Sequence, residues 1–293
     1  MSTEPQISIV TPCLNAAGVI RDVINSVKQS STGAIEHIVV DGGSTDGTQE
    51  ILQEYDHLIL IFTPDDGPYD ALNTGFAHAL GDVMGWINAD DLYVPRALDV
   101  VADIFSRFDA VEWLTTTYPL FAGAAGQIVG AARTHSYSRY RSLHPDATRF
   151  GGSLPTAMQQ ESTFWRRQLW KKSGAYIDAN YKFAADFELW LRFWQHAEVY
   201  AANAPFGCFR WGPSQRSQVF HEEYARELDD ILQRYGGEYA GSLRTLGRRA
   251  ALSLRGLPQD ILKFLPCAHS QQTANFDRDA KCWQISKRFF IPD

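Results

Sequence analysis

Two adjacent carboxylates, Asp90 and Asp91, end a short apolar run that begins at Val83. Such a run is typical of a buried strand, in which neighbouring side chains point to opposite faces. Two like charges side by side are unfavourable unless a cation or hydrogen-bond donors offset them, so the pair indicates a metal or ligand site. The alternative is capping of a helix that starts near Pro95, because Asp is a common cap and Pro a common first-turn residue.

The elements around this pair alternate between strand and helix patterns. Apolar runs predict strands at 7–12, 36–41, 58–63 and 83–88, and apolar residues at helical spacing predict helices at 17–29, 48–55 and 69–80. This alternation is typical of the α/β class and predicts a doubly wound, parallel sheet.

Polar residues follow three of these strands. Thr11 and Pro12 end the first strand, Asp41 ends the second, and Asp90 and Asp91 follow the fourth. Ligands of such sheets bind beyond the carboxyl ends of the strands. Because helix caps do not require this convergence on one edge, it favours a metal or ligand role for the Asp pair over capping.

The turn after Asp41, residues 42–47, narrows the class of ligand. It is not the Gly-x-Gly-x-x-Gly of dinucleotide folds, and no Gly-Lys-Ser/Thr phosphate loop occurs in the chain, so neither hydride transfer nor P-loop hydrolysis is indicated. The Asp41 carboxylate suits a ring N–H or a ribose hydroxyl, and turn formation is its other interpretation. Asp70 and Asn73, three apart at a helix start, add a polar face beside the same edge.

The middle of the chain is expected to complete the site. A strand at 112–117 and a hairpin at 118–133 precede the polar stretch 134–155, which we interpret as a long binding loop. Residues 159–167 mix polar and aromatic side chains, as sugar-binding surfaces require. A strand that ends in a solvated basic turn is the alternative for this stretch.

Two further charged residues are candidates. Asp186 lies in the first turn of a helix at 184–194, where it is either a cap or a carboxylate presented at a site. Arg210 follows a short strand and suits phosphate in geometry, although surface arginines usually bind none.

Length and charge bound the function. A chain of 293 residues suits one large domain with an appendage, and a net charge of −7 argues against nucleic acid as the main partner. The charge is uneven, because residues 241–293 hold nine Lys and Arg against four Asp. The basic helix expected at 242–257 predicts peripheral contact with the inner membrane, with a helix packed on the body as the alternative.

The four cysteines indicate the compartment. Cys13, Cys208, Cys267 and Cys282 lack paired spacing, so neither a zinc site nor a disulfide scaffold is indicated, and a reduced cytoplasmic location fits. The polar N-terminus lacks a signal-peptide core, and we expect no membrane-spanning segment.

Taken together these stretches resemble the family 2 nucleotide-sugar glycosyltransferases of the GT-A fold. The resemblance covers about residues 6–217, and the stretches that carry it are 7–15, 40–47, 66–75, 88–91, 160–167 and 185–192. It implies a GT-A catalytic domain at 1–217, with a mostly parallel Rossmann-like sheet. The nucleotide-binding half would be about 1–117 and the acceptor half about 118–217. Residues 218–293 would form a helical, basic extension.

The resemblance also implies roles for single residues. The donor-binding residues would be Thr11, Pro12, Asn15, Asp41, Asp70, Asn73, Asp90 and Arg210. Asp91, with Asp90, would hold Mn²⁺ or Mg²⁺, which prefer carboxylate and phosphate oxygens. Asp186 would be the catalytic base of an inverting transfer, since a base must lie across the anomeric carbon from the leaving group. From their polar and aromatic types, Gln160, Glu161, Trp165 and Trp190 are the candidates for acceptor contact, with a core position as the alternative for Trp190.

The implied substrates are a nucleoside-diphosphate sugar, with UDP favoured, and a glycan or lipid-linked acceptor. The family members most similar in pattern build bacterial lipopolysaccharide, capsule or exopolysaccharide. Three positions depart from the family pattern: Thr74 replaces a Lys or Arg, Gly42 replaces the second Asp of an Asp-Asp-Gly turn, and Gly207 replaces the Gln of the Gln-x-x-Arg-Trp motif of processive synthases. With no expected membrane span, a non-processive enzyme that adds one sugar is predicted.

Two other function classes compete. A sugar-nucleotide nucleotidyltransferase usually carries a Gly-rich basic loop after its first strand, whereas residues 11–18 hold no basic residue. A non-catalytic glycan-binding module needs no base, so the joint presence of Asp41, Asp90, Asp91 and Asp186 argues against it.

Overall fold

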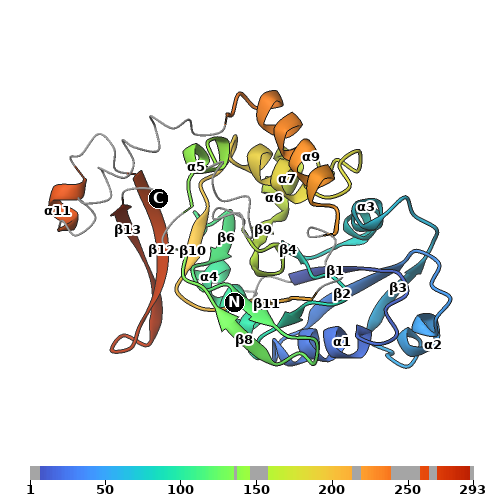
Figure 1. Ribbon diagram of the computed structural model, residues 1–293. Coiled ribbons are helices and arrows are strands. Elements are labelled where there is room, and N and C mark those ends of the chain that lie inside the picture. The colour runs from blue at the N-terminus through green and yellow to red at the C-terminus, as the bar shows by residue number, and fades with distance from the viewer. Residues whose placement is uncertain are drawn as a thin grey trace.

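The computed structural model describes residues 7–134, 137–145, 158–212, 219–238, 258–263 and 269–290. In this part of the chain nine strands form one sheet in the order β13-β12-β10-β6-β9-β4-β1-β2-β3 (Figure 1). Neighbours pair in parallel except at β9, which runs antiparallel to β4 and β6, and at β13, which runs antiparallel to β12. The prediction of a mostly parallel α/β sheet is confirmed.

The first four strands lie close to their predicted positions. They are β1 (Ile7–Cys13), β2 (Ile35–Asp41), β3 (Leu58–Phe62) and β4 (Val83–Trp86). Beyond β4 the sheet continues with β9 (Phe164–Arg166), β6 (Trp113–Thr116) and β10 (Tyr200–Ala202). Position 13 of β1 pairs with Asp41 of β2, so the carboxyl ends of these strands lie level. Ile87, just after β4, donates its N–H to Val10. The polar groups after these strands therefore meet at one edge, as predicted.

Helices cover both faces of the sheet. On one face, α1 (Ile20–Gln29) and α4 (Ala97–Arg107) bury their apolar stripes in one hydrophobic cluster, to which α2 (Thr48–Leu52) contributes. On the other face lie α3 (Pro68–His78), α6 (Arg167–Lys172), α7 (Ala185–Phe193) and α9 (His221–Arg234). The spacing of the α1 stripe, Ile20, Val23, Ile24 and Val27, is the reason that the sequence predicts this helix.

A cluster of tryptophans forms the centre of the second face. Trp190 of α7 stacks on Trp86 of β4 at 5.6 Å and on Trp113 of β6 at 5.7 Å between ring centroids. Trp165 of β9 packs edge-on against both Trp86 and Trp190. Aromatic pairs at these separations contribute beyond their buried area, so this cluster fixes α7 rigidly on the sheet.

A second, four-stranded sheet lies beside the Asp pair. Its order is β5 (Leu92–Tyr93), β11 (Gly207–Arg210), β7 (Leu120–Ala122) and β8 (Ile128–Ala131). The hairpin of β7 and β8 confirms the prediction for residues 118–133. Because β5 starts directly after Asp91 and pairs with β11, this small sheet anchors the end of the Asp turn.

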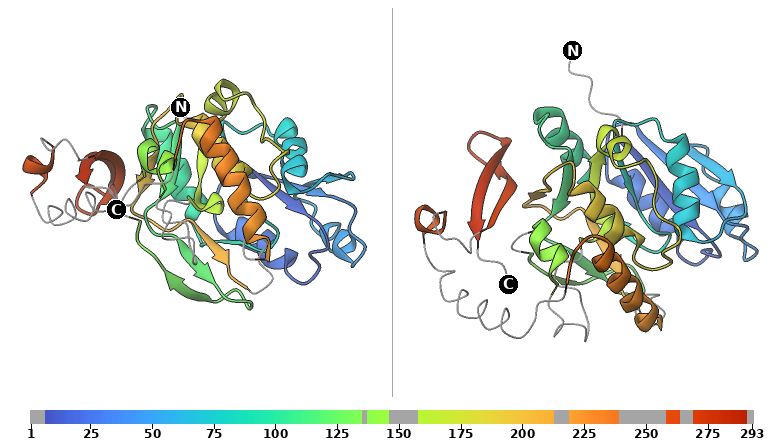
Figure 2. Two further views of the ribbon diagram at one scale, coloured as in Figure 1. Left: turned by 45° about the horizontal axis from the view of Figure 1, so that its top comes forward. Right: turned by 90° about the horizontal axis from the view of Figure 1, so that it is seen from above.

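The prediction of a helical C-terminal extension is only partly right. α9 confirms a helix near 220–235, and α11 (Gln259–Leu262) is a short further helix. Residues 269–290, however, form the antiparallel hairpin of β12 (His269–Asp277) and β13 (Cys282–Phe290), which extends the main sheet through β10 (Figure 2). Trp283 and Ala274 join the core, which explains why this segment pairs with the sheet instead of forming a helix. The predicted basic helix at 242–257 lies outside the described residues.

The stretch interpreted as a long loop is partly helical. α5 (Arg139–Leu143) lies within it, and residues 135–136 and 146–157 lie outside the described part of the chain. Among the described residues, no helix has the length and apolar character needed to cross a bilayer.

Candidate active site

Asp91 is held by the protein at the end of β4. Its side chain is fully buried, and its Oδ1 accepts the Arg210 N–H at 2.9 Å. Its Oδ2 accepts the side-chain amides of Asn88 at 3.2 Å and Gln160 at 3.0 Å. Burial, followed by the neighbouring Asp90 charge, raises the pKa of Asp91 well above its usual range. Asp91 therefore organises the turn, and Gln160, predicted to bind acceptor, supports Asp91.

Asp90 is the more open member of the pair. It is half-buried, and Arg210 contacts its main-chain carbonyl at 2.6 Å rather than its carboxylate. Burial raises the pKa of Asp90, while its own N–H and the Arg210 charge lower it. The Asp90 carboxylate is thus the better placed of the two to meet a ligand.

Arg210 locks this turn instead of facing a donor. It is 7% exposed, and its guanidinium donates to Asp90 O, to Ala124 O at 2.7 Å and to Asp22 Oδ2 at 3.0 Å. These protein oxygens occupy the N–H donors with which an arginine could otherwise bind a phosphate. The prediction that Arg210 binds the donor is corrected to a structural role that ties the Asp turn to α1 and to the β7–β8 hairpin.

The Asp41 carboxylate belongs to its own turn. Its Oδ1 accepts the N–H groups of Gly43 and Ser44 and the Gln49 amide, and its Oδ2 accepts the Ser44 hydroxyl at 2.5 Å. Asn15 braces the same turn by accepting the Thr45 N–H at 2.9 Å. The alternative interpretation, turn formation, is the one that these contacts support, and the Asp41 side chain is fully buried.

The two remaining residues of this strand end are buried. The Thr11 hydroxyl lies 2.9 Å from His37 Nε2 in the core of the sheet. Burial lowers the pKa of His37 to about 3, so this partner is neutral. Thr11 and Pro12 are both buried and pair with β2, so their predicted contact with the donor is corrected to a structural role in the sheet.

Asp65 is a residue that the sequence analysis missed. A Cβ placed on Gly42 would lie 2.4 Å from Asp65 Oδ2, so the Asp65 carboxylate takes the space of a side chain at position 42. Burial raises the pKa of Asp65, and Asp70, Asp41 and Asp66 raise it further. The signal was the departure at Gly42, because an Asp-Asp-Gly turn would leave no room for Asp65.

Asn73 and Asp70 make protein contacts within the expected donor side. The Asn73 amide pairs with the backbone of Ile177 through two hydrogen bonds, of 2.7 and 2.8 Å. Asp70 accepts the Asp66 N–H at 3.2 Å. The predicted donor role of Asn73 is corrected to a tie between α3 and the segment before α7, because both polar atoms of its amide are engaged.

Asp186 lies in the first turn of α7, as predicted. It is half-buried, and its Oδ1 accepts the N–H of Phe187 at 2.8 Å. Burial raises the pKa of Asp186 to about 6, and the Glu227 charge contributes to the rise. A carboxylate with a pKa near 6 is ionised at neutral pH and still basic enough to accept a proton.

A further buried acid, Glu161, lies in the turn before β9. It is 1% exposed, and within the described part of the chain neither carboxylate oxygen has a hydrogen-bond partner. Burial raises the pKa of Glu161 well above its usual range, and the charges of Asp91, Asp90 and Asp186 raise it further. Its side chain packs where a Cβ on Gly207 would lie, at 2.6 Å from Glu161 Cγ, so the third family departure makes room for it.

Trp165 and Trp190 are core residues, and their predicted contact with acceptor is wrong. Their exposures are 0% and 3%, because both rings belong to the tryptophan cluster beneath α7. The aromatic ring open to a sugar in this region is Trp211, which is 57% exposed and directly follows Arg210. For Trp190 the alternative interpretation, a core position beside a stripe at helical spacing, is the one that its burial supports.

The donor set suits a hard cation, although the described residues contain no ready-made group of three or more His, Cys, Asp or Glu ligands. Carboxylates and substrate phosphates together usually hold Mg²⁺ or Mn²⁺, with few protein ligands. The half-buried Asp90 carboxylate is the group of this set that a cation can reach.

Comparison with known proteins supplies a family. The sequence model described as Glycosyl transferase family 2 matches residues 8–120. An uncharacterized glycosyltransferase of Mycobacterium tuberculosis is 31% identical over 198 residues, which cover 66% of this chain and 70% of that protein.

Two solved structures share the fold. Staphylococcus aureus TarS 1–349 in complex with UDP has a TM-score of 0.56 at 18% identity, over 88% of this chain and 78% of that one. The present chain covers 49% of the longer TarS chain. Mannosyltransferase PcManGT from Pyrobaculum calidifontis, in complex with GDP-Man and Mn²⁺, has a TM-score of 0.57 at 17% identity, over 89% of this chain and 79% of that one.

Proposed function

The chain belongs to glycosyl transferase family 2, and we propose that it moves one sugar from a UDP-sugar to a hydroxyl of a glycan or lipid-linked acceptor, with inversion. The acceptor class proposed is a precursor of a bacterial surface polysaccharide. Glycosyl transfer is the general activity of the family, and the donor, stereochemistry and acceptor are the parts proposed.

One observation carries the proposal: the segment before Asp186 is hydrogen-bonded to the donor side, through Lys182 Nζ to Asp66 O at 3.1 Å and through the Tyr69 hydroxyl to Phe183 O at 3.2 Å. Trp190 of the same helix stacks on Trp86 of β4, the strand that leads to the Asp pair, so Asp186 and the Asp pair come from distant parts of the chain to one region of the sheet. A single-displacement transfer needs this arrangement, because the leaving diphosphate and the base must flank one anomeric carbon. A binding module or a nucleotidyltransferase needs no base at the Asp186 position.

Asp186 is the proposed general base. Ionised at neutral pH, it accepts the proton of the acceptor hydroxyl while the hydroxyl oxygen attacks the anomeric carbon and the bond to the diphosphate breaks. One displacement inverts the anomeric centre, so an α-linked donor gives a β-linked product. Rigid packing of α7 on the tryptophan cluster keeps the base at a fixed distance from the donor side.

Asp90 is the proposed carboxylate for a divalent cation. Bound between Asp90 and the donor diphosphate, Mn²⁺ or Mg²⁺ would neutralise charge on the leaving group. The present contacts support Asp90 over Asp91 because three protein donors already occupy the Asp91 carboxylate. PcManGT, the fold relative with Mn²⁺, supports metal use in general.

UDP is the proposed nucleotide. A carboxylate at the base position suits the N3–H of uracil, and the half-buried Asp65 carboxylate lies beside Gly42, directly after the buried Asp41. The complex of TarS with UDP supports the choice. Trp211 is the proposed stacking surface for an acceptor sugar, since it is exposed beside the Asp turn.

The experiment is a binding and stereochemical test on the full chain. Calorimetry with UDP, GDP and TDP in Mn²⁺ should give the tightest binding for UDP, and that binding should weaken on chelation. With the matching UDP-sugar, proton NMR of the first products should show inversion. Tightest binding of GDP, or retention at the anomeric carbon, would overturn these parts of the proposal.

We also propose contact with the inner-membrane surface through the basic stretch 242–257. Its support is the charge of +5 carried by residues 241–293, from nine basic and four acidic residues. Replacing Arg244, Arg248 and Arg249 with Gln should release the chain from vesicles that contain anionic lipid. Deleting the tail is a poorer test, because β12 and β13 belong to the main sheet. Unchanged flotation of the triple variant would remove the proposal.

A further inference from the structure

The segment that leads into α7 has no regular structure and no cap of its own. Ala184 precedes α7 without any side-chain hydrogen bond to the first turn, although the first N–H groups of a helix need acceptors. Asp186 lies in this first turn, so whatever fixes residues 182–184 also fixes Asp186.

Glu227 of α9 binds the backbone of the three residues just before α7. Its Oε1 accepts the N–H of Lys182 at 2.6 Å, and its Oε2 accepts the N–H groups of Phe183 at 2.8 Å and Ala184 at 2.9 Å. A carboxylate at this position also opposes the positive end of the α7 dipole. Three charge-assisted bonds from one side chain hold the backbone more firmly than a neutral cap would.

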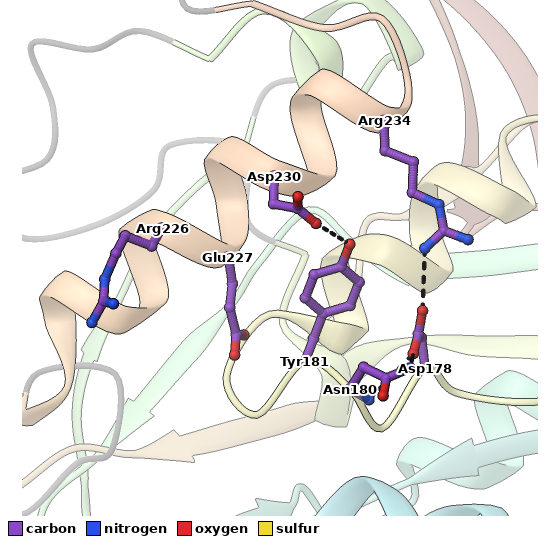
Figure 3. Close-up of a pocket in the computed structure, with 7 residues that line it drawn as sticks. All are labelled: Asp178, Asn180, Tyr181, Arg226, Glu227, Asp230 and Arg234. Atoms are coloured by element: carbon purple, nitrogen blue, oxygen red, sulfur yellow. Dashed lines mark hydrogen bonds and ion pairs between the residues drawn. The ribbon is translucent and has the colours of Figure 1, made fainter.

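The same face of α9 makes two more contacts with this segment. Asp230 accepts the Tyr181 hydroxyl at 2.6 Å, and Arg234 pairs with Asp178 at 3.2 Å. Figure 3 shows these side chains pointing from α9 to the segment around a cavity of about 460 Å³. Residues 227, 230 and 234 lie on one helix face, so a single surface of α9 holds residues 178–184.

The C-terminal end of α9 also contacts α7, the helix that carries Asp186. The Tyr235 hydroxyl donates to Glu188 Oε1 of α7, and Glu188 forms a buried pair with Arg192. α9 therefore contacts both α7 and the segment before it.

The segment is tied to the donor side as well. Ile177 pairs with Asn73 of α3, the Tyr69 hydroxyl donates to Phe183 O at 3.2 Å, and the Lys182 ammonium donates to Asp66 O at 3.1 Å. Residues 177–184 thus form a strap between α3 on the donor side and α9.

We propose that Glu227 is a positioning residue for the general base, and that α9 is for this reason part of the catalytic machinery. The inference rests on the proposed function, because it takes Asp186 as the base. It extends that machinery beyond the family match at residues 8–120 and beyond residue 217.

The charge of Glu227 acts on the pKa of Asp186, and a purely structural role of Glu227 would not change that pKa. The charged groups that act on Asp186 are Glu227 from α9 and Glu161 from the turn before β9, and Glu227 raises the Asp186 pKa. Replacing Glu227 with a neutral residue should therefore lower that pKa. The acid limb of the rate profile should then move to lower pH.

The test compares Glu227→Gln and Glu227→Ala with Glu223→Gln, a control four residues earlier on the same helix, whose ion-pair partner among the described residues is its neighbour Arg226. The donors are UDP-glucose and UDP-N-acetylglucosamine. The rate measured is the release of UDP as the sugar is transferred to water or to an acceptor. We expect Glu227→Ala to lower kcat about 10- to 100-fold with a donor KM within about twofold, since small misplacements of a catalytic group cost this much. Glu227→Gln should fall between, with its acid limb moved to lower pH, and Glu223→Gln should match the wild type.

Amide exchange at residues 182–184 gives a second measurement that does not depend on activity. These amides should exchange slowly in the wild type and faster in Glu227→Gln. Unchanged exchange, or an unshifted acid limb with near-normal kcat, would overturn the inference. A wild type that binds UDP and shows the exchange pattern but releases none from any UDP-sugar would instead overturn the proposed function.

Discussion

The carboxylates on the two sides of the site differ in how far the protein satisfies them. On the donor side, Asp41 accepts four hydrogen bonds and Asp91 three, all from neighbouring protein groups. Across the site, Asp186 accepts the N–H of its neighbour Phe187, and both oxygens of Glu161 lack a partner among the described residues. The donor side is thus preorganised, while across the site the half-buried Asp186 carboxylate keeps acceptor capacity for a substrate proton.

The largest expected effect comes from the base. Asp186→Asn should lower turnover by about 10²- to 10⁴-fold, because an amide cannot accept the proton of the attacking hydroxyl. UDP affinity in Mn²⁺, measured by calorimetry, should stay within about twofold. Asp82→Asn, an exposed acid at the other end of β4, is the control and should match the wild type. A variant at position 186 that keeps more than a tenth of the rate would move the base elsewhere.

The Asp pair gives the next effect and separates a structural from a ligand-binding acid. Asp91→Ala leaves buried donors of Asn88, Gln160 and Arg210 unpaired, so urea unfolding should show a loss of about 1–3 kcal/mol. Asp90→Ala should change the unfolding free energy by less than about 0.5 kcal/mol, as expected of a site with no such contacts. It should nevertheless remove the gain in UDP affinity that Mn²⁺ provides. The reverse pattern would restore Asp91 as the metal ligand.

The pH profile tests the acceptor side alone. Because the base acts in its ionised form and burial raises the pKa of Asp186 to about 6, the rate should fall about tenfold per pH unit below pH 6 and level off above it. The stability effect has the opposite sign. A raised carboxyl pKa stabilises the fold fully below about 3.8, and this contribution is lost as pH rises through about 6. An acid limb centred near pH 4 would show that Asp186 is not the group titrating.

Glu161 should give a small effect on the fold, in the stabilising direction. Glu161→Gln removes a buried carboxyl with unpartnered oxygens, so the unfolding free energy at pH 7 should stay the same or rise by about 1 kcal/mol. Gln127→Glu, an exposed change on the β7–β8 hairpin, is a control for added or removed charge. A loss of stability in Glu161→Gln would show that the Glu161 carboxylate has a structural partner and is not held for a substrate.

Much of the fold was predictable from the sequence. Strands and helices up to residue 133 follow from apolar periodicity, since β1, β2, β3 and β4 are short apolar runs and α1 has a clear buried stripe. The carboxyl ends of parallel strands must share an edge, so the convergence of Asp41 and the Asp pair was predictable as well. The hairpin of β12 and β13 was not, because its polar, weakly alternating residues become a strand pair only through contact with β10.

The sequence by itself determined which residue types are present at the site, and the tertiary structure decided what each one contacts. A carboxylate in a strand-end turn has the same sequence signature whether it meets a ligand or its own backbone, as Asp90 and Asp91 show. Trp190 and Trp211 are the same type of residue, yet Trp190 lies in the core and Trp211 is exposed. Glu227 is brought to the segment before Asp186 by contacts between α9 and α7, which are far apart in the chain. Such contacts depend on how the helices pack on the sheet, and no local pattern encodes them.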